Sequence, residues 1–348
     1  MKKKRDSMTK TGFIWCVKAI AAGITAFCIL ALFCVFYYNP PIHVVSGDKA
    51  TCYKREPGSF WARATEGMAW GKIDQNGYNN SESVWETGEV DLLMMGSSQT
   101  EGLYVRADQC ASSLLNGMFS EDGRGYQVYN IGMSAHTVYQ NANNLQQAME
   151  VYQPKRYVAI ETGSVSYDIL QYLAIEDGSF ENLTLQEYPP VIAFAEKIPY
   201  VKLLYQQWKN YRNKEGGSEA LSPGEDVYDS AGAAGRTGKL LDYMNDRVTA
   251  EGCTLILYYI PEVAFDEQGN MYFASDANTR ESYGQMCREK GILFVDMADV
   301  LQRAYDEDHE VGAGFANTTV GYGHLNAKGH RMLANAIYEV IAETEEQK

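Results

Sequence analysis

The hydrophobic pattern of this chain begins with one long apolar run close to the N-terminus. Residues 19–38 are almost all apolar and contain no charged side chain, and Asn39-Pro40-Pro41 follows directly. About 20 apolar residues are enough to cross a bilayer as a helix. The run therefore predicts a transmembrane helix over 19–38, ended by the two prolines.

Beyond residue 88 the pattern changes to short apolar runs that alternate with amphipathic stretches. The runs predict strands at 89–95, 126–131, 156–161, 254–260 and 292–295. The amphipathic stretches predict helices at 107–118, 137–152, 275–290 and 326–343. Such alternation is typical of a parallel sheet that is covered on both faces. We therefore expect a three-layer α/β/α domain with a five-stranded parallel sheet in flavodoxin-like order.

Two segments lie outside this alternation. Residues 39–88 read as an irregular lead-in with scattered Trp and Tyr, and 166–233 interrupts the domain after its third strand. The interruption contains an aromatic-rich helix candidate at 198–212, which favours a helical cap folded over the ligand site; a disordered surface excursion is the alternative. The predicted organisation is a basic tail (1–18), a transmembrane helix (19–38), the lead-in (39–88) and an α/β domain (89–348) with the insertion 166–233.

The basic residues before the apolar run predict the orientation of the chain. Lys and Arg favour the cytoplasmic side, so we expect a single-pass membrane protein with its N-terminus inside and its domain extracytoplasmic. A cleaved signal peptide is the alternative, but it needs a shorter apolar stretch that ends in small residues, whereas this one ends in aromatic residues. A lipoprotein reading of Cys34 also fails, because Phe33 stands where a small residue is needed.

Charge and cysteine content narrow the classes of partner and cofactor. Residues 1–43 carry six basic residues and one acid, a net charge of +5. The whole chain has a net charge of −15, so the rest of it carries −20. Nucleic acid and anionic lipid need clustered Lys and Arg, so we expect no nucleic-acid partner. Neither the seven cysteines nor the five histidines show metal-ligand spacing, and we expect no metal and no cofactor. Export permits disulfides, but buried free thiols are an equal alternative.

Two short segments offer the residues of nucleophilic chemistry. Gly96-Ser97-Ser98 follows the first predicted strand, and His324-Leu325-Asn326 stands before the last predicted helix. A serine hydroxyl becomes a good nucleophile only when a base takes its proton, and a histidine can be that base. Ligands of parallel α/β sheets bind outside the carboxyl ends of the strands, where Ser98 and also Gly132 are expected.

Taken in order, these segments resemble the conserved blocks of the SGNH (GDSL-like) hydrolase superfamily, in its membrane-anchored extracytoplasmic branch. Gly96-Ser97-Ser98 is similar to the first block, Asn130-Ile131-Gly132 to the second, and His324-Leu325-Asn326 to the last. The resemblance implies Ser98 as nucleophile and His324 as base. It also implies an oxyanion hole from the backbone amides of Ser98 and Gly132, with a hydroxyl of Thr162 or Ser164 in place of the usual asparagine.

One position departs from that pattern in a way that matters for catalysis. The last block normally has an aspartate three residues before the histidine, and this chain has Gly321 there. Two alternatives remain for orienting His324: a backbone carbonyl, or a carboxylate from another strand end, for which the candidates are Glu161, Glu262 and Asp296. His136 and His330 are interpreted as structural residues.

The resemblance implies a serine esterase or O-acyltransferase that acts on acyl esters of cell-surface glycans or teichoic-acid-like polymers, with a membrane-bound acyl-transfer partner. A glycan-binding or assembly protein on the same fold, with an impaired site, is the main alternative. A membrane scaffold that uses only its anchor and cap is a third hypothesis.

Overall fold

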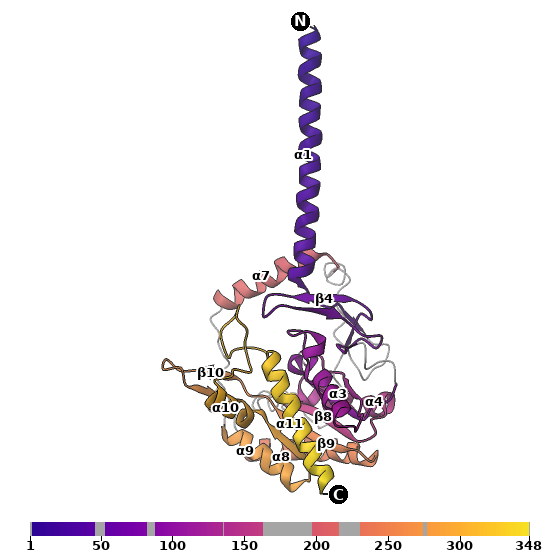
Figure 1. Cartoon of the computed structure of the whole chain (residues 1–348), viewed down its shortest axis with the longest axis vertical. Coiled ribbons are helices and arrows are strands. Elements are labelled where there is room, and N and C mark those ends of the chain that lie inside the picture. The colour runs from indigo at the N-terminus through magenta and orange to yellow at the C-terminus, as the bar shows by residue number, and fades with distance from the viewer. Residues whose placement is uncertain are drawn as a thin grey trace.

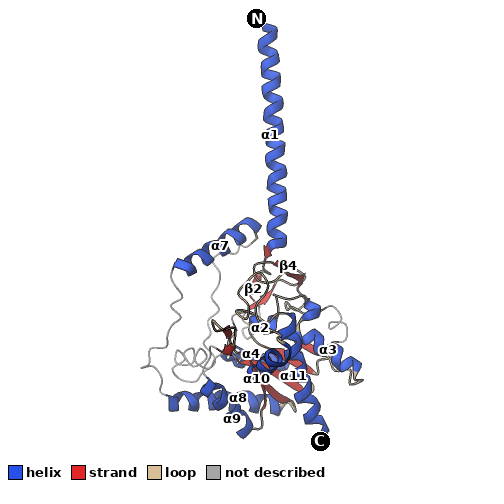
Figure 2. Cartoon of the chain, turned by 60° about the vertical axis from the view of Figure 1, so that its left-hand side comes forward, coloured by secondary structure: helices blue, strands red, loops and turns tan. Residues whose placement is uncertain are grey.

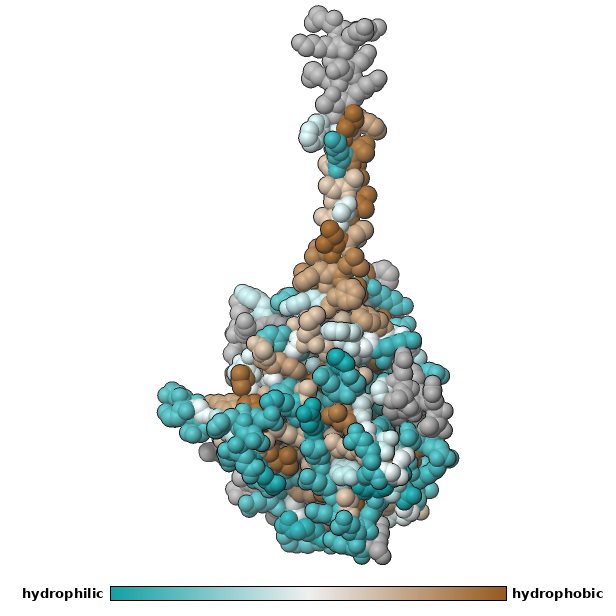
Figure 3. Space-filling view, in the orientation of Figure 1, coloured by the Kyte–Doolittle hydropathy of each residue, from teal (hydrophilic) through white to brown (hydrophobic). Residues whose placement is uncertain are grey.

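The computed structural model describes residues 2–45, 53–81, 88–134, 136–162, 197–215, 230–273 and 277–347. Helix α1 (Lys2–Tyr37) extends away from an α/β body, and the C-terminus lies at the far end of that body (Figure 1). Within Gly12–Tyr37 of α1, a stretch of 18 residues has a mean hydropathy of 2.6, and only 6% of that stretch is buried. Figure 3 shows hydrophobic residues along this helix and around its junction with the body. This stretch is a candidate membrane span or signal sequence.

The main sheet has five strands in the order β12-β9-β8-β6-β7, and every neighbouring pair is parallel. Numbered along the chain, this is the 2-1-3-4-5 order of flavodoxin-like folds. The prediction of a five-stranded parallel sheet in that order is confirmed. The strands are β6 (Leu92–Met95), β7 (Val128–Asn130), β8 (Tyr157–Thr162), β9 (Thr254–Tyr259) and β12 (Leu293–Asp296).

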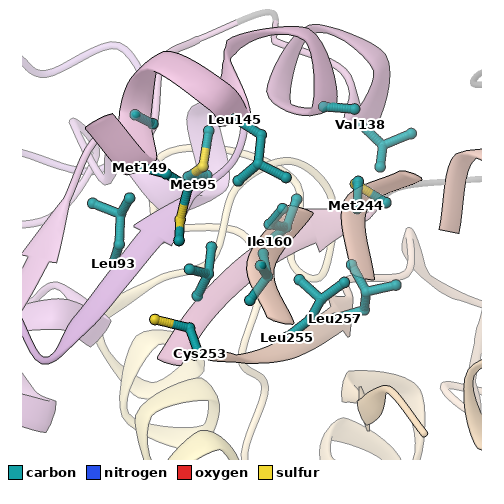
Figure 4. Packing of buried hydrophobic residues seen from close by; sticks show 14 of the residues in the cluster. Leu93, Met95, Val138, Leu145, Met149, Ile160, Met244, Cys253, Leu255 and Leu257 are labelled. Atoms are coloured by element: carbon teal, nitrogen blue, oxygen red, sulfur yellow. The ribbon is translucent and has the colours of Figure 1, made fainter. Parts of the chain in front are cut away.

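Helices cover both faces of this sheet. Successive strand residues point to opposite sides, so each strand contributes apolar side chains to both faces. Leu93 and Met95 of β6 face one hydrophobic cluster, and Leu92 and Met94 face the other. Figure 4 shows Leu93 and Met95 beside Leu145 and Met149. The first cluster includes α4 (Val138–Tyr152), α8 (Ser230–Ala250) and α9 (Ala277–Glu289); the second includes α3 (Ala111–Glu121), α10 (Met297–Asp308) and α11 (Ala327–Glu346).

The lead-in segment is more regular than its sequence indicates. Its strands are short and its turns follow closely, so the sequence shows no clear periodicity. It forms a three-stranded antiparallel sheet in the order β1-β4-β5 and a hairpin of β2 with β3. Strand β1 continues α1 without a break, so the small sheet joins the apolar helix to the α/β body. The bounds are β1 (Tyr38–Asn39), β2 (His43–Val45), β3 (Tyr53–Arg55), β4 (Phe60–Arg63) and β5 (Ala69–Lys72).

Further elements were not anticipated from the pattern: α10, and the hairpin of β10 (Val263–Phe265) with β11 (Met271–Phe273). The six cysteines in the described part of the chain are all free thiols, and Cys52 lies outside it.

The described helix of the insertion does not cover the carboxyl edge of the sheet as a cap. Helix α7 (Pro199–Glu215) lies against α1 and β1 instead (Figures 1 and 2). The Tyr38 hydroxyl donates to Gln206 Oε1 at 3.0 Å, and the Lys202 ammonium donates to Asn39 Oδ1 at 2.9 Å. Residues 166–196 and 216–229 of the predicted insertion lie outside the described residues.

Candidate active site

Ser98 lies at the start of a short helix directly after the carboxyl end of a central strand. Strand β6 ends at Met95, and α2 (Ser98–Glu101) begins after the N-cap residue Ser97, whose hydroxyl accepts from the Gln99 amide. The turn therefore places the Ser98 side chain beyond the sheet, at the edge where parallel α/β sheets bind ligands.

His324 reaches this serine from the segment before α11. Its Nε2 lies 2.9 Å from Ser98 Oγ, which is within reach for proton transfer. Gln99 joins the two segments on either side of this contact: its Oε1 accepts from the Leu325 amide at 2.8 Å, and its Nε2 donates to the Gly323 carbonyl at 3.3 Å. The predicted pair is thus held together by the hydrogen bonds of the Gln99 side chain to the backbone beside His324, as well as by its own contact.

The carboxylate that orients His324 is Glu66, from the turn between β4 and β5. His324 Nδ1 lies 2.9 Å from Glu66 Oε2, and the His324 backbone amide donates to Glu66 Oε1 at 2.7 Å. Both carboxylate oxygens therefore hold the histidine. Figure 2 shows β4 and α2 together at the end of the α/β body nearest α1.

None of the three acids predicted for this role contacts His324. Glu161 instead binds the turn that carries Ser98, Glu262 is exposed, and Asp296 caps α10 and pairs with Arg280 at 3.0 Å. The prediction was wrong because it considered only strand ends of the main sheet, whereas the acid comes from the small antiparallel sheet. The only signal in the sequence was an unassigned acid in the Trp-containing lead-in.

Gly321 explains why the usual aspartate is not available. Its φ is +80°, in the left-handed region that disfavours side chains, and an added Cβ there would lie 2.4 Å from the Phe265 ring. A side chain at this position is therefore excluded both by the backbone and by the neighbouring ring.

The turn that carries Glu66 is clamped by Asn317. The Gly67 amide donates to Asn317 Oδ1 at 2.7 Å, and Asn317 Nδ2 donates to the carbonyls of Ala64 and Gly67 at 2.9 and 3.1 Å. On the other side of Glu66, the Ala64 amide donates to the Tyr37 carbonyl at the end of α1. The carboxylate is thus fixed between the segment before α11 and the apolar helix.

An aromatic ring and a guanidinium complete the surroundings of His324. The Tyr104 ring stacks on the imidazole with a centroid distance of 3.7 Å and an interplanar angle of 15°. Arg63 donates to the Tyr104 hydroxyl at 2.5 Å and lies 4.8 Å from the centre of its ring. These contacts restrict rotation of the imidazole.

Glu66 keeps its negative charge in these surroundings. Partial burial by itself raises the pKa of Glu66, but the hydrogen bonds from His324 and the charges of His324 and Arg63 outweigh burial, and the net pKa is lowered. An ionised carboxylate at Nδ1 favours the tautomer whose Nε2 can accept a proton.

Glu161 holds the nucleophile turn from beneath. Its Oε2 accepts from the Ser97 amide at 2.9 Å and the Thr100 amide at 3.1 Å, and its two oxygens also accept from the hydroxyls of Ser97 and Thr100. Glu161 is 6% exposed, so four donors compensate a buried charge. Its place is structural support of Ser98.

The predicted oxyanion donors are only partly available. The Ser98 amide makes no hydrogen bond within the described part of the chain, whereas the Gly132 amide donates to Asn130 Oδ1 at 2.8 Å. An added Cβ at Gly132 would lie 2.7 Å from the Glu101 amide nitrogen, so this glycine allows close packing against α2. The Thr162 hydroxyl is buried and makes no hydrogen bond among the described residues, and Ser164 lies outside them.

A buried ion pair supports the loop after β7. Arg55 Nε lies 2.6 Å from Glu101 Oε1, and both side chains are 1% exposed. Glu101 Oε2 accepts from the Ser134 amide at 2.9 Å. Burial raises the pKa of Glu101, but the charge and hydrogen bonds of Arg55 and the bond from Ser134 lower it to about 2. The lead-in segment thus supports the site through Arg55 as well as through Glu66.

The other two candidate histidines lie in buried surroundings. His330 Nδ1 accepts from the Ala111 amide at 3.3 Å, and burial, followed by the charge of His324, lowers the pKa of His330 to about 4. Burial is also the largest effect on His136, and the pKa of His136 is lowered to about 4. Among the described residues no group of three or more His, Cys, Asp or Glu side chains could hold a metal ion.

Comparisons with known proteins find likeness in solved structures only. No family model matches the chain, and no curated protein matches it. TesA is 15% identical with a TM-score of 0.40, over 72% of this chain and 97% of TesA. LAE5, an α/β hydrolase enzyme from the metagenome of Lake Arreo, Spain, is 17% identical with a TM-score of 0.42, over 72% and 93%. A variant of Axe2, an acetyl xylan esterase from Geobacillus stearothermophilus, is 15% identical with a TM-score of 0.40, over 73% and 97%. At these identities and TM-scores the likenesses carry no argument about this chain, and what each protein acts on is a property of that protein.

Proposed function

We propose that this protein is a serine esterase of the SGNH type, with Ser98 as nucleophile, His324 as general base and Glu66 as the orienting acid. The observation that carries the proposal is the continuous chain of contacts from Ser98 Oγ to His324 Nε2 and from His324 Nδ1 to Glu66 Oε2, each 2.9 Å. A nucleophile, a base within reach and a third group that orients the base make up the triad arrangement.

The residues support the following sequence of steps. His324 Nε2 takes the proton of Ser98 Oγ as that oxygen attacks the ester carbonyl, and Glu66 stabilises the imidazolium that forms. The imidazolium then gives its proton to the leaving alkoxide, which leaves an acyl-Ser98 and a neutral imidazole. A water molecule, or a sugar hydroxyl in a transferase, gives its proton to His324 as its oxygen attacks the acyl group, and the imidazolium returns the proton to Ser98 Oγ as the acyl–Ser98 bond breaks.

The amide of Ser98 is the donor that we propose for the oxyanion. A backbone N–H aimed at the developing charge is worth several kcal/mol in a water-poor site, typically about 3 kcal/mol for one donor. The Gly132 amide can bind the oxyanion only if its hydrogen bond to Asn130 Oδ1 breaks. We therefore assign Gly132 to the packing of the loop on α2. Thr162 and Ser164 stay candidates for a second donor.

We further propose that the enzyme is anchored by α1, with its N-terminus inside and its domain extracytoplasmic. Support comes from the basic tail and from the uncharged run that follows. The proposed substrates are acyl esters of cell-surface glycans or teichoic-acid-like polymers, with hydrolysis or transfer to a sugar hydroxyl as the outcome and a membrane-bound acyl-transfer partner. The alternative, an impaired glycan-binding protein, depended on the absence of an acid that orients His324. In the present proposal Glu66 is that acid.

A fluorophosphonate probe tests the proposed nucleophile directly. The purified full-length protein should react covalently at Ser98, and Ser98→Ala should abolish both labelling and hydrolysis of a small acetyl ester. Ser120→Ala is the control, because Ser120 is an exposed serine near the end of α3, and it should leave labelling and hydrolysis unchanged. Labelling of Ser98→Ala at the wild-type rate would exclude this nucleophile. An unlabelled wild type that still binds glycan would favour the binding protein.

A further inference from the structure

Helix α7 presents a band of large apolar and aromatic side chains to the outside. Their exposed fractions run from 36% to 67%. At 100° per residue the five positions fall within an arc of about 120°, as in an amphipathic helix. The residues are Val201, Leu204, Tyr205, Trp208 and Tyr211.

The opposite side of α7 is bound to the protein. Lys202 donates to Asn39 Oδ1 at 2.9 Å and to the Pro40 carbonyl at 3.3 Å, and Gln206 accepts from the Tyr38 hydroxyl at 3.0 Å. These polar contacts fix the rotation of the helix about its axis. The aromatic band therefore faces away from β1 and the body.

A contact between α7 and α1 shows which part of the apolar helix lies beside the start of α7. The Tyr200 hydroxyl donates to the Phe27 carbonyl at 2.5 Å, and the two rings lie 4.8 Å apart. Phe27 is ten residues before Tyr37, and a rise of 1.5 Å per residue places it about 15 Å inside the end of α1. Phe27 lies within the candidate span Gly12–Tyr37. The side chain of Tyr200 in the first turn of α7 therefore reaches into the bilayer if this stretch crosses it, while Lys202 contacts Asn39 and Pro40 just beyond the end of α1.

We propose that α7 is an interfacial membrane helix, with its aromatic band in the outer leaflet of the bilayer that α1 crosses. This inference rests on the anchoring role proposed for α1. Trp and Tyr are enriched where headgroups meet acyl chains, and an amphipathic helix binds there through its apolar face. Two further aromatic residues are exposed on the small sheet beside α1: Phe60, which is 40% exposed and packs edge-on against Phe36 of α1, and Trp70, which is 51% exposed.

The second attachment has a consequence for the active site. Strand β4 contacts α1 and leads directly into the turn that carries Glu66, while α7 contacts β1, the neighbour of β4. Two membrane contacts instead of one stop the body from swinging about the end of α1. The edge that carries Ser98 is then held facing the lipid headgroups, which suits an acyl donor that is itself bound to the membrane.

Quenching by brominated lipids tests this placement in the full-length protein. The protein is reconstituted into nanodiscs of phosphatidylcholine and phosphatidylglycerol, with or without bromine on the acyl chains, and no other protein is present. The Trp208 contribution is the fluorescence of the wild type minus that of Trp208→Phe. We expect brominated lipid to remove more than half of it. The matched control is Val151→Trp in the Trp208→Phe protein, since Val151 is 53% exposed near the end of α4 at the opposite edge of the sheet; its fluorescence should not be quenched.

The Trp15 contribution, measured in the same way with Trp15→Phe, separates the two proposals. Trp15 lies within the apolar part of α1. If Trp15 is quenched and Trp208 is not, α1 is in the bilayer and the placement of α7 is overturned, including the case in which a partner protein covers the aromatic band. If neither is quenched, the anchoring proposal and the inference that rests on it both fail.

Discussion

Glu66 and His324 are joined by two hydrogen bonds although 258 positions separate them in the chain. The carboxylate belongs to a small antiparallel sheet that continues the apolar N-terminal helix, and the histidine belongs to the last loop of the α/β body. The contact thus completes the candidate site from two parts of the fold that the sequence presents as unrelated.

Glu66→Gln should lower kcat for a small acetyl ester by about 10²- to 10⁴-fold with little change in KM. The amide keeps the shape but loses the charge, and it can favour the wrong imidazole tautomer, which is costly in triads of this kind. Steady-state kinetics of the purified full-length protein measure the effect. Glu262→Gln, an exposed strand-end acid, should retain wild-type kcat. Equal activity of Glu66→Gln and wild type would contradict the assignment of Glu66.

Asn317→Ala should lower kcat by about tenfold without a comparable loss of stability. Asn317 clamps the backbone on both sides of Glu66, and a displacement of about 1 Å in a catalytic group can cost up to about 100-fold. Kinetics together with thermal unfolding separate positioning from folding. Val320→Ala, an exposed residue of the same loop, should leave both measurements unchanged. A loss of thermal stability that accounts for all of the lost activity would argue for a purely structural role.

Gly321→Asp should not rescue Glu66→Gln, even though it restores the aspartate usual in this family pattern. The positive φ and the Phe265 ring oppose any side chain there, so the variant should also be less stable than the wild type. Gly125→Asp is a control for the backbone cost alone, because Gly125 has a φ of +65° and no neighbour within 4 Å of an added Cβ. Recovery of kcat in the double variant would show that the aspartate can reach His324.

The buried pair of Arg55 and Glu101 should make folding stability depend on acid pH. The pKa of Glu101 is lowered from 4.5 to about 2 in the folded protein, so its contribution is present above pH 4.5 and is lost as the pH falls towards 2. A shift of this size corresponds to about 3 kcal/mol of the free energy of unfolding. Denaturant unfolding at several pH values measures the slope. Glu101→Gln should be less stable at pH 7 and should show a flatter slope below pH 4.5; an unchanged slope would contradict this role.

Protease added to intact, wall-stripped cells should degrade the chain beyond residue 43 and leave the basic N-terminal tail protected. The expectation follows from the charge asymmetry around the apolar helix. Immunoblots with tags at each terminus report the two fragments. Protection of the C-terminal tag on intact cells, with digestion after lysis, would indicate the opposite orientation.

The elements that could be predicted correctly are those whose signals are local in the sequence. The short apolar run at 92–95 and the amphipathic pattern of 137–152 required only neighbouring residues, and both form the expected strand and helix. Ser98 and His324 could be paired in advance because Ser98 directly follows a strand of the main sheet, at the edge where ligands bind, and His324 stands just before the last helix.

The acid that orients His324 could not be predicted, because its contact joins two distant segments and neither carries a local signal for it. Glu66 follows a strand of four residues in a segment without clear periodicity, and its carboxylate is placed by the Asn317 clamp and by the join of β4 to the end of α1. The same holds for α7, whose aromatic spacing predicts a buried face, whereas its contacts with α1 and β1 turn that face outward. Local patterns fix which residues share a face, but the neighbour of that face depends on packing between distant segments.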